Sequence, residues 1–308
     1  MEEKNIIKNI LGTEARNQKS TKLDMMSVYE ILSLMNKENS VAVSAVESAI
    51  PQIEEVVKVA TNVISSGGRI IYIGAGTSGR LGVLDSSECP PTFGVSEDVF
   101  VGVIAGGDKA LRLAIEGAED DKNAGRNDLI NINLKKEDML IGIAASGSTP
   151  YVIGAMEYAK SLGCQVVAIV NNQDSSMGKI ATSKIELLTG AEVLSGSTRL
   201  KAGTAQKLVL NMISTSVMIG LGKVYENLMV DVKPTNEKLR NRAISIVMQA
   251  TDVEKDVAKK ALIDADGNIK IAIFMLLTGK DKNIAEKMIK EEKGFLRKAI
   301  EIANKENG

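Results

Sequence analysis

The segment that most constrains the fold is residues 70–94, in which a strand passes through a glycine-rich loop into a helix. Residues 70–73 form an apolar run typical of a buried strand. The loop Gly74-Ala75-Gly76-Thr77-Ser78-Gly79 follows, and we expect Thr77 or Ser78 to be the N-cap of the helix. The start of that helix would direct free backbone N–H groups and the positive end of the helix dipole at the loop. The segment therefore predicts an anion site.

The same loop matches G-x-G-x-x-G, so a dinucleotide site is the first alternative. That site needs a compact βαβ unit with an acidic residue roughly 20 residues on, at the end of the next strand. Here Cys89-Pro90-Pro91 interrupts the segment after the helix, and the next strand-like run, residues 99–104, has no acidic residue after it until Asp108. The hydroxyls of the loop suit a phosphate monoester, which we favour over a dinucleotide.

Strand-like and helical runs alternate through the middle of the chain. This alternation predicts an α/β fold in which a parallel sheet is covered by helices on both faces, with ligands at the carboxyl ends of the strands. The expected strands are residues 69–73, 99–104, 139–144, 166–170 and 185–188. The expected helices between and after them are residues 79–85, 109–124, 150–162, 176–182 and 200–225.

Helical periodicity also marks both ends of the chain. We expect N-terminal helices over residues 22–35 and 39–66, and only helices after Asn236. Gly and Asp residues separate the later helices, expected at 236–250, 252–263, 268–278, 281–293 and 295–305. We therefore predict two domains, an α/β domain with N-terminal helices over residues 1–235 and a small helical domain over residues 236–308.

Composition excludes several classes of function. The 308 residues carry a formal net charge of −1, only 3% are aromatic and Trp is absent, so we expect no nucleic-acid partner. The longest apolar-rich stretch, residues 208–222, is too short for a membrane span, and we see no secretion signal near the N-terminus. Two cysteines form no disulfide framework. We expect a cytoplasmic protein.

Histidine is absent from the chain. A catalytic triad with His is therefore excluded, and a zinc-type His/Cys cluster cannot form. General acid–base chemistry must come from Glu, Asp, Lys, Tyr or Cys.

A second hydroxyl-rich loop, Ser146-Gly147-Ser148-Thr149-Pro150, follows the third expected strand and begins a helix. Its hydroxyls could simply cap that helix, as most Ser and Thr at such positions do. Two loops of this kind at the ends of strands in one sheet favour a shared phosphosugar site instead.

Charged residues offer candidate acids, bases and anion ligands. Glu88 stands beside a stiff and rather apolar segment, a setting that can hold a carboxyl group in place. For an acidic cluster at the end of the 109–124 helix, the residues alone favour a solvent-facing role. That cluster comprises Glu116, Glu119, Asp120 and Asp121. Three basic residues could neutralise an anion or could equally be surface charges, namely Arg199, Lys201 and Lys207.

Taken together, these residues resemble the sugar isomerase (SIS) domain and, more narrowly, the N-acetylmuramic acid 6-phosphate etherase family. The resemblance runs through most of residues 12–242, and Gly76 to Gly94 is its most specific part. It also covers residues 12–17, 114–120, 142–151, 194–210 and 221–242. Ser86-Ser87 stands where the family often carries alanine. The longer glucokinase regulatory protein shares parts of the loops.

The resemblance implies a three-layer α/β/α SIS fold and a carbon–oxygen lyase acting on a ring-opened sugar phosphate. D-lactate would leave C3 of N-acetylmuramate 6-phosphate, and water would add back to give N-acetylglucosamine 6-phosphate. By family position, Glu88 is the acid at the leaving lactate and Glu119 is the base at C2, which overrides the solvent-facing interpretation of Glu119. The family's phosphate ligands correspond to Thr77, Ser78, Ser146, Gly147 and Ser148.

The resemblance also implies a homodimer with sites near the subunit boundary and a reaction without metal or redox cofactor. The C-terminal helices partly resemble a ubiquitin-associated fold.

Two alternatives for the function stay open. An aldose–ketose isomerase would use the same loops with one glutamate base, and a sugar-phosphate-sensing regulatory module would bind without turnover.

Overall fold

The computed structural model describes residues 12–232 and 236–305 and divides into two compact units. The first unit comprises the described residues up to Ser87 together with Asp98–Ser214. The second comprises Glu88–Glu97 and the described residues from Thr215 onward. The domain boundary expected between residues 235 and 236 adjoins 233–235, which lie outside the described residues, and it stays a prediction.

The first unit is built on a five-stranded, fully parallel sheet with strand order β2-β1-β3-β4-β5. The chain runs from β1 outward to β2 and then returns to add the other strands on the opposite side of β1. The strand order therefore reverses between β1 and β3, and the crevice at such a switch point is where doubly wound sheets bind ligands. The strands are β1 (Ile70–Gly74), β2 (Phe100–Ile104), β3 (Met139–Ala144), β4 (Gln165–Val170) and β5 (Ser183–Glu186).

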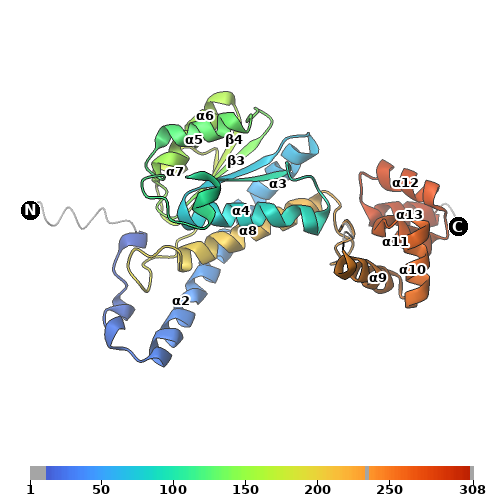
Figure 1. Cartoon of the computed structure of the whole chain (residues 1–308), viewed down its shortest axis with the longest axis horizontal. Coiled ribbons are helices and arrows are strands. Elements are labelled where there is room, and N and C mark those ends of the chain that lie inside the picture. The colour runs from blue at the N-terminus through green and yellow to red at the C-terminus, as the bar shows by residue number, and fades with distance from the viewer. Residues whose placement is uncertain (1–11, 233–235, 306–308) are drawn as a thin grey trace, which may run out of the picture. The chain divides into compact units, whose positions relative to one another are not determined.

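Helices cover both faces of this sheet, which confirms the expected three-layer α/β/α class (Figure 1). One face packs Ile71, Ile73 and Leu140 against apolar residues of the helices α5 (Lys122–Asn131), α6 (Pro150–Leu162) and α7 (Ser176–Ile180). On the other face Tyr72 donates a hydrogen bond to Asp85, and Asn211 donates to the same carboxylate at 2.7 Å. That face carries α3 (Ile50–Ser65), α4 (Gly76–Phe93) and α8 (Lys201–Gly220).

Helix α4 is longer than expected and contradicts two interpretations of the sequence. It begins at Gly76, so Thr77 and Ser78 lie in its first turn rather than capping it. It also continues through Pro90 and Pro91, which therefore do not interrupt the segment after a helix. A proline removes one backbone donor and crowds the carbonyl four residues earlier, and in the last turn this cost is small enough for packing to override. Gly94, at a φ of 66°, follows the end of the helix.

The N-terminal helices differ from the expected ranges. Helix α2 (Val28–Ser48) passes through residues 36–38, where a break was expected, and the break falls at Ala49 instead. A capping box between Ser27 and Glu30 fixes the start of α2. Pro51, in the first turn of α3, suits a helix start because its missing N–H has no partner there in any case.

The second unit contains the all-helical C-terminal part that the sequence predicts. Its core includes Val247, Phe274, Ala285 and Ala303, from four of the five helices. The helices are α9 (Glu237–Thr251), α10 (Lys255–Asp264), α11 (Ile269–Thr278), α12 (Lys282–Glu291) and α13 (Leu296–Lys305). Among the described residues of the whole chain, no helix combines the length and apolarity that crossing a membrane requires.

Candidate active site

A cavity of about 470 Å³ opens at the carboxyl edge of the sheet, beside the switch point between β1 and β3. It brings together the loops that follow these two strands, as the sequence predicts. The lining residues are Glu14, Ala75, Gly76, Thr77, Ser78, Glu119, Asp120, Ala144, Ala145, Ser146, Ser148, Thr149, Pro150, Gly196 and Thr198.

The first wall of the cavity is the start of α4, which glycine holds against β1. A Cβ on Gly74 would lie 2.7 Å from the Gly79 nitrogen, and one on Gly79 would lie 2.6 Å from the Gly74 oxygen. Only glycine fits at both positions, so the strand and the helix meet backbone to backbone. Thr77 and Ser78 follow at once, in the turn whose N–H groups have no partner within the helix.

The second wall is the loop between β3 and α6. Ser148 donates to the Ser146 hydroxyl through both its backbone N–H, at 3.2 Å, and its own hydroxyl, at 3.1 Å. Gly147, at a φ of 71°, makes the turn between them, and a Cβ there would lie 2.4 Å from that of Ser175. Gly147 therefore shapes the loop, although it is not itself among the lining residues.

Ser78 belongs to a buried chain of hydrogen bonds that the sequence did not reveal. Its hydroxyl donates to Gln206 at 2.8 Å, Gln206 donates to Asn171 at 3.0 Å, and Asn171 donates to the Leu187 carbonyl at 3.0 Å. Because a carbonyl can only accept, this last bond fixes the direction of the whole chain. The Ser78 proton therefore points to Gln206, and Ser78 offers the cavity its oxygen lone pairs and its backbone N–H.

Glu119 lies in a loop, not in the helix expected over residues 109–124. A short 3₁₀ helix, Gly107–Leu111, is followed by irregular backbone in which Gly117 has a φ of 73°. Asp121 then caps α5 by accepting from Asn123 and Ala124, so the acidic cluster precedes a helix rather than ending one.

The loop that carries Glu119 is held at two points. Arg80 of α4 donates to the Leu111 carbonyl at 3.2 Å and to the Leu113 carbonyl at 3.0 Å. The Glu119 carbonyl accepts from the Tyr151 N–H in the first turn of α6 at 3.0 Å. Arg80 thus connects one wall of the cavity to the loop that carries Glu119, a function that the motif Gly79-Arg80 did not indicate on its own.

The charges of the lining residues are all negative. Glu14, Glu119 and Asp120 contribute carboxylates, and no Lys or Arg among residues 12–232 and 236–305 lines the cavity. Hydroxyls, backbone N–H groups and the starts of α4 and α6 are the groups among these residues that favour an anion.

Glu88 is not among the lining residues of this cavity. It lies within α4, not after it, ten residues beyond Ser78. With a rise of about 1.5 Å per residue, that interval corresponds to roughly 15 Å along the helix axis.

Lys201 is neither a surface charge nor a cavity residue. It is 3% exposed and donates to the Glu38 carboxylate at 2.7 Å, so it neutralises a carboxylate of the protein itself. Asn17 and Lys19 donate to the same carboxylate at 2.9 and 2.8 Å. Burial alone would raise the pKa of Glu38, but these hydrogen bonds outweigh burial and lower it to about 2.

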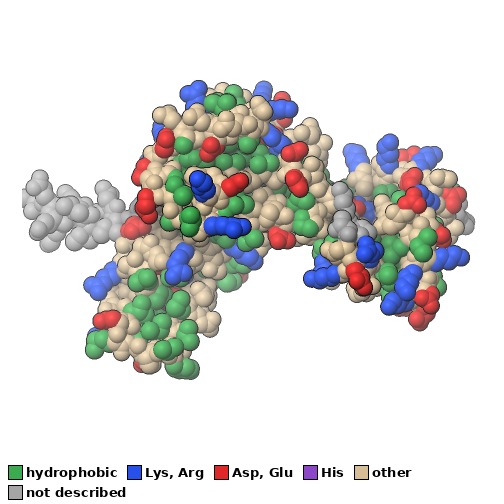
Figure 2. Space-filling view, in the orientation of Figure 1, with side chains coloured by type: hydrophobic (Ala, Val, Ile, Leu, Met, Phe, Trp, Pro, Cys, Tyr) green, Lys and Arg blue, Asp and Glu red, His purple; other side chains and the backbone are tan. Residues whose placement is uncertain are grey.

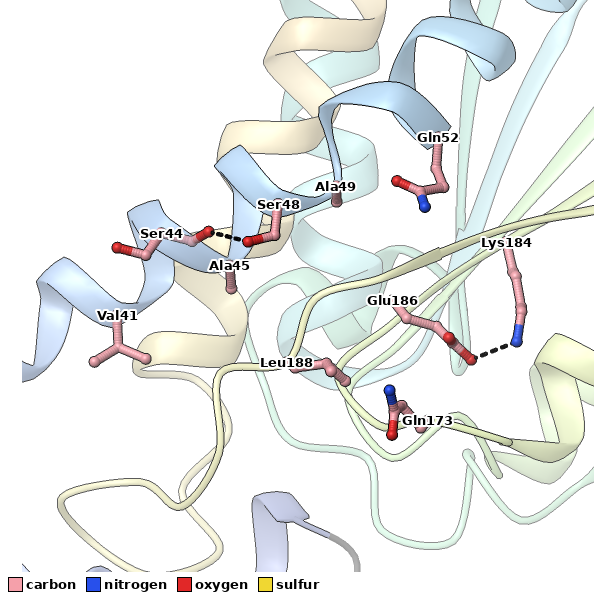
Figure 3. Close-up of a pocket in the computed structure, with 10 residues that line it drawn as sticks. All are labelled: Val41, Ser44, Ala45, Ser48, Ala49, Gln52, Gln173, Lys184, Glu186 and Leu188. Atoms are coloured by element: carbon pink, nitrogen blue, oxygen red, sulfur yellow. Dashed lines mark hydrogen bonds and ion pairs between the residues drawn. The ribbon is translucent and has the colours of Figure 1, made fainter.

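A second cavity, of about 460 Å³, lies between α2 and the end of β5 (Figure 3). Its charged side chains, Lys184 and Glu186, are already paired with each other at 2.9 Å. None of the site residues predicted from the sequence lines it.

Within 12–232 and 236–305, no group of His, Cys, Asp and Glu is arranged to hold a metal ion.

Two family descriptions match parts of the chain. The glucokinase regulatory protein N-terminal SIS domain matches residues 51–160, and the SIS domain matches residues 123–216.

Several relatives match nearly the whole chain. An N-acetylmuramic acid 6-phosphate etherase of Halalkalibacterium halodurans is 54% identical over 294 residues, which are 96% of this chain and 99% of the relative. The protein of that name from Actinobacillus succinogenes is 53% identical over 302 residues, covering 97% and 99%. Among solved structures, a phosphoheptose isomerase from Francisella tularensis is 18% identical with a TM-score of 0.48, covering 62% of this chain and 98% of that one.

Proposed function

The chain belongs to the N-acetylmuramic acid 6-phosphate etherase family, and we propose that it cleaves the D-lactyl ether at C3 of N-acetylmuramate 6-phosphate. The products are N-acetylglucosamine 6-phosphate and D-lactate, in the recycling of cell-wall amino sugars within the cytoplasm. The observation that carries the proposal is the identity of more than half of all residues along almost the full length of two etherases. The hydroxyl-lined cavity beside a carboxylate supports it from the structure.

The phosphate group anchors the substrate in this proposal. Thr77, Ser78, Ser146 and Ser148 line the cavity at the starts of two helices, and Gly147 shapes the second loop. Holding a remote dianion fixes the sugar carbons against the catalytic groups and converts binding energy into orientation.

The chemistry then needs two carboxyl groups in different protonation states. In the ring-opened aldehyde, Glu119 takes the C2 proton, the C3–O bond breaks, and the departing lactate oxygen takes a proton from Glu88. This leaves a C2–C3 double bond conjugated with the aldehyde. Glu88, now a carboxylate, then takes a proton from a water molecule while the water oxygen bonds to C3. Glu119 returns a proton to C2. The sum is addition of one water and release of D-lactate.

Glu88 acts in the site of a second copy of the chain in this proposal. The roughly 15 Å of helix rise between Ser78 and Glu88 exceeds the reach of a hexose held at its phosphate. A second copy also has a surface to bind. Hydrophobic side chains gather on α2 (Figure 2), where Val28 and Tyr29 are 74% and 80% exposed.

The test is to incubate the protein with N-acetylmuramate 6-phosphate and to assay free D-lactate and the hexose phosphate formed. We expect equal amounts of D-lactate and N-acetylglucosamine 6-phosphate. An isomerised hexose phosphate without lactate would establish the isomerase alternative. Tight binding without any product would establish the regulatory alternative.

A further inference from the structure

Glu14 lines the cavity although it lies far from the other lining residues in the sequence. The Thr13 N–H donates to the Asn172 side chain at 3.3 Å, and that side chain donates back to the Thr13 hydroxyl at 3.0 Å. Asn172 also donates to the carbonyl of Ala145, a cavity residue, at 3.0 Å. These three bonds fix the backbone beside Glu14 to the loop that carries Ser146.

The Glu14 carboxylate has no hydrogen-bond or ion-pair partner among the described residues. Among residues 12–232 and 236–305, no side chain or backbone group donates a hydrogen bond to it or pairs with it. Across from it stands Gly196, where a Cβ would lie 3.4 Å from Glu14 Oε2. Gly196 has a φ of 77° and no side chain, and the Glu14 side chain is exposed beside it.

An ionised carboxylate can only accept hydrogen bonds, and it repels other anions. Beside a bound phosphate it is unfavourable unless the ligand also offers uncharged donors. We propose that Glu14 is a specificity-determining residue that accepts hydrogen bonds from the uncharged hydroxyl or amide N–H groups of the bound sugar. The inference rests on the proposed sugar-phosphate site, and it gives Glu14 a function distinct from proton abstraction by Glu119.

The test compares two ligands, inorganic phosphate and N-acetylglucosamine 6-phosphate, by calorimetric titration of the full chain. Glu14→Gln removes the charge while it keeps the shape of the side chain. Because a hydrogen bond to a charged group is replaced by a weaker one, we expect about tenfold weaker binding of the sugar phosphate. Inorganic phosphate should bind as well as before or more tightly, since a like charge has gone. Glu137→Gln, in the exposed turn before β3 at the opposite edge of the sheet, controls for net charge.

Three results would overturn the inference. Equal weakening of both ligands would show that Glu14 only shapes the pocket, and unchanged sugar-phosphate binding would show that it does not contact the sugar. Loss of proton exchange at C2 with binding intact would make Glu14 the base. If the etherase proposal is wrong, the unaltered chain will release no D-lactate. The titration needs no turnover, so it tests Glu14 separately.

Discussion

At the scale of single residues, Arg80 connects the helix that carries the proposed phosphate ligands to the loop that carries Glu119. Its guanidinium bridges the carbonyls of Leu111 and Leu113, at the start of the loop that ends in Glu119. One side chain of α4 therefore sets the position of the proposed base relative to Thr77 and Ser78. An ammonium group is a point charge and cannot reproduce the two-pronged contact of a guanidinium.

We expect Arg80→Lys to lower kcat about ten- to hundredfold, because small misplacements of a catalytic group have effects of this size. Phosphate affinity should stay nearly constant, and added guanidinium ion should restore part of the kcat of Arg80→Ala, in which the space of the side chain is free. The measurements are kcat, KM and the rate of solvent deuterium exchange at C2. Arg126→Lys is the matched control, since Arg126 stacks over Tyr158 outside the cavity. A parallel loss of phosphate affinity without guanidinium rescue would contradict the positioning function.

Which cavity residues the sequence can predict depends on how their positions are set. Thr77, Ser78, Ser146 and Ser148 were predictable as neighbours because carboxyl ends of parallel strands meet at one edge of a sheet. Glu14 was not, because its place depends on the tertiary hydrogen bonds between Thr13 and Asn172. Gln206 and Asn171 were not predicted as partners of Ser78 for the same reason. No local sequence pattern indicates a buried side chain that orients a serine.

At the scale of elements, the start of α8 connects the N-terminal segment to the sheet unit. Glu192 accepts from the backbone N–H groups of Lys201 and Ala202 at 3.0 and 2.9 Å and thereby caps the helix. Glu38 of α2 joins the same region through its ion pair with Lys201. Since Lys201 is only 3% exposed, removal of the Glu38 carboxylate would leave a buried positive charge without its ion-pair partner.

Acid should therefore lower the free energy of unfolding partly through protonation of Glu38. Its folded pKa of about 2 lies below the ordinary value of 4.5, so its contribution is complete above pH 4.5 and is lost as the pH falls toward 2. The shift corresponds to about 3 kcal/mol. Urea unfolding at pH 5 and pH 3 should show a smaller pH dependence for Glu38→Gln than for the unaltered chain. Glu54→Gln should change the dependence much less, because its ion pair with Lys58 is exposed and screened by solvent, and equal dependence in all three proteins would contradict this account.

The sequence predicted correctly the helices and strands that have a clear signal in their own residues. The five strands and the C-terminal helices fall within a few residues of their expected ranges, because hydrophobic periodicity and glycine punctuation set them. The prediction failed at α4, where packing carries a helix through Pro90 and Pro91. It failed again at residues 112–121, where Gly117 and the N-cap Asp121 outweigh the helical pattern.

At the scale of the whole molecule, the proposed reaction needs a second copy of the chain. Thr77, Ser78 and Glu119 share one cavity, whereas Glu88 lies ten residues further along α4. In the described part of the chain, no basic residue lines the cavity to balance a phosphate and a lactyl carboxylate. Both features are consistent with the proposal that a second copy completes the site, and the side chains of Val28 and Tyr29 on α2 are exposed.

The measurement that tests this account most directly is D-lactate release by a mixture of Glu88→Gln and Glu119→Gln variants, unfolded together and refolded. Each variant alone should be inactive. In a two-fold dimer, half of the assemblies are mixed and one site in each has both glutamates, so the mixture should regain about one quarter of the original activity. A mixture as inactive as its components, although the variants are shown to exchange subunits, would contradict the account, and so would full activity of either variant alone.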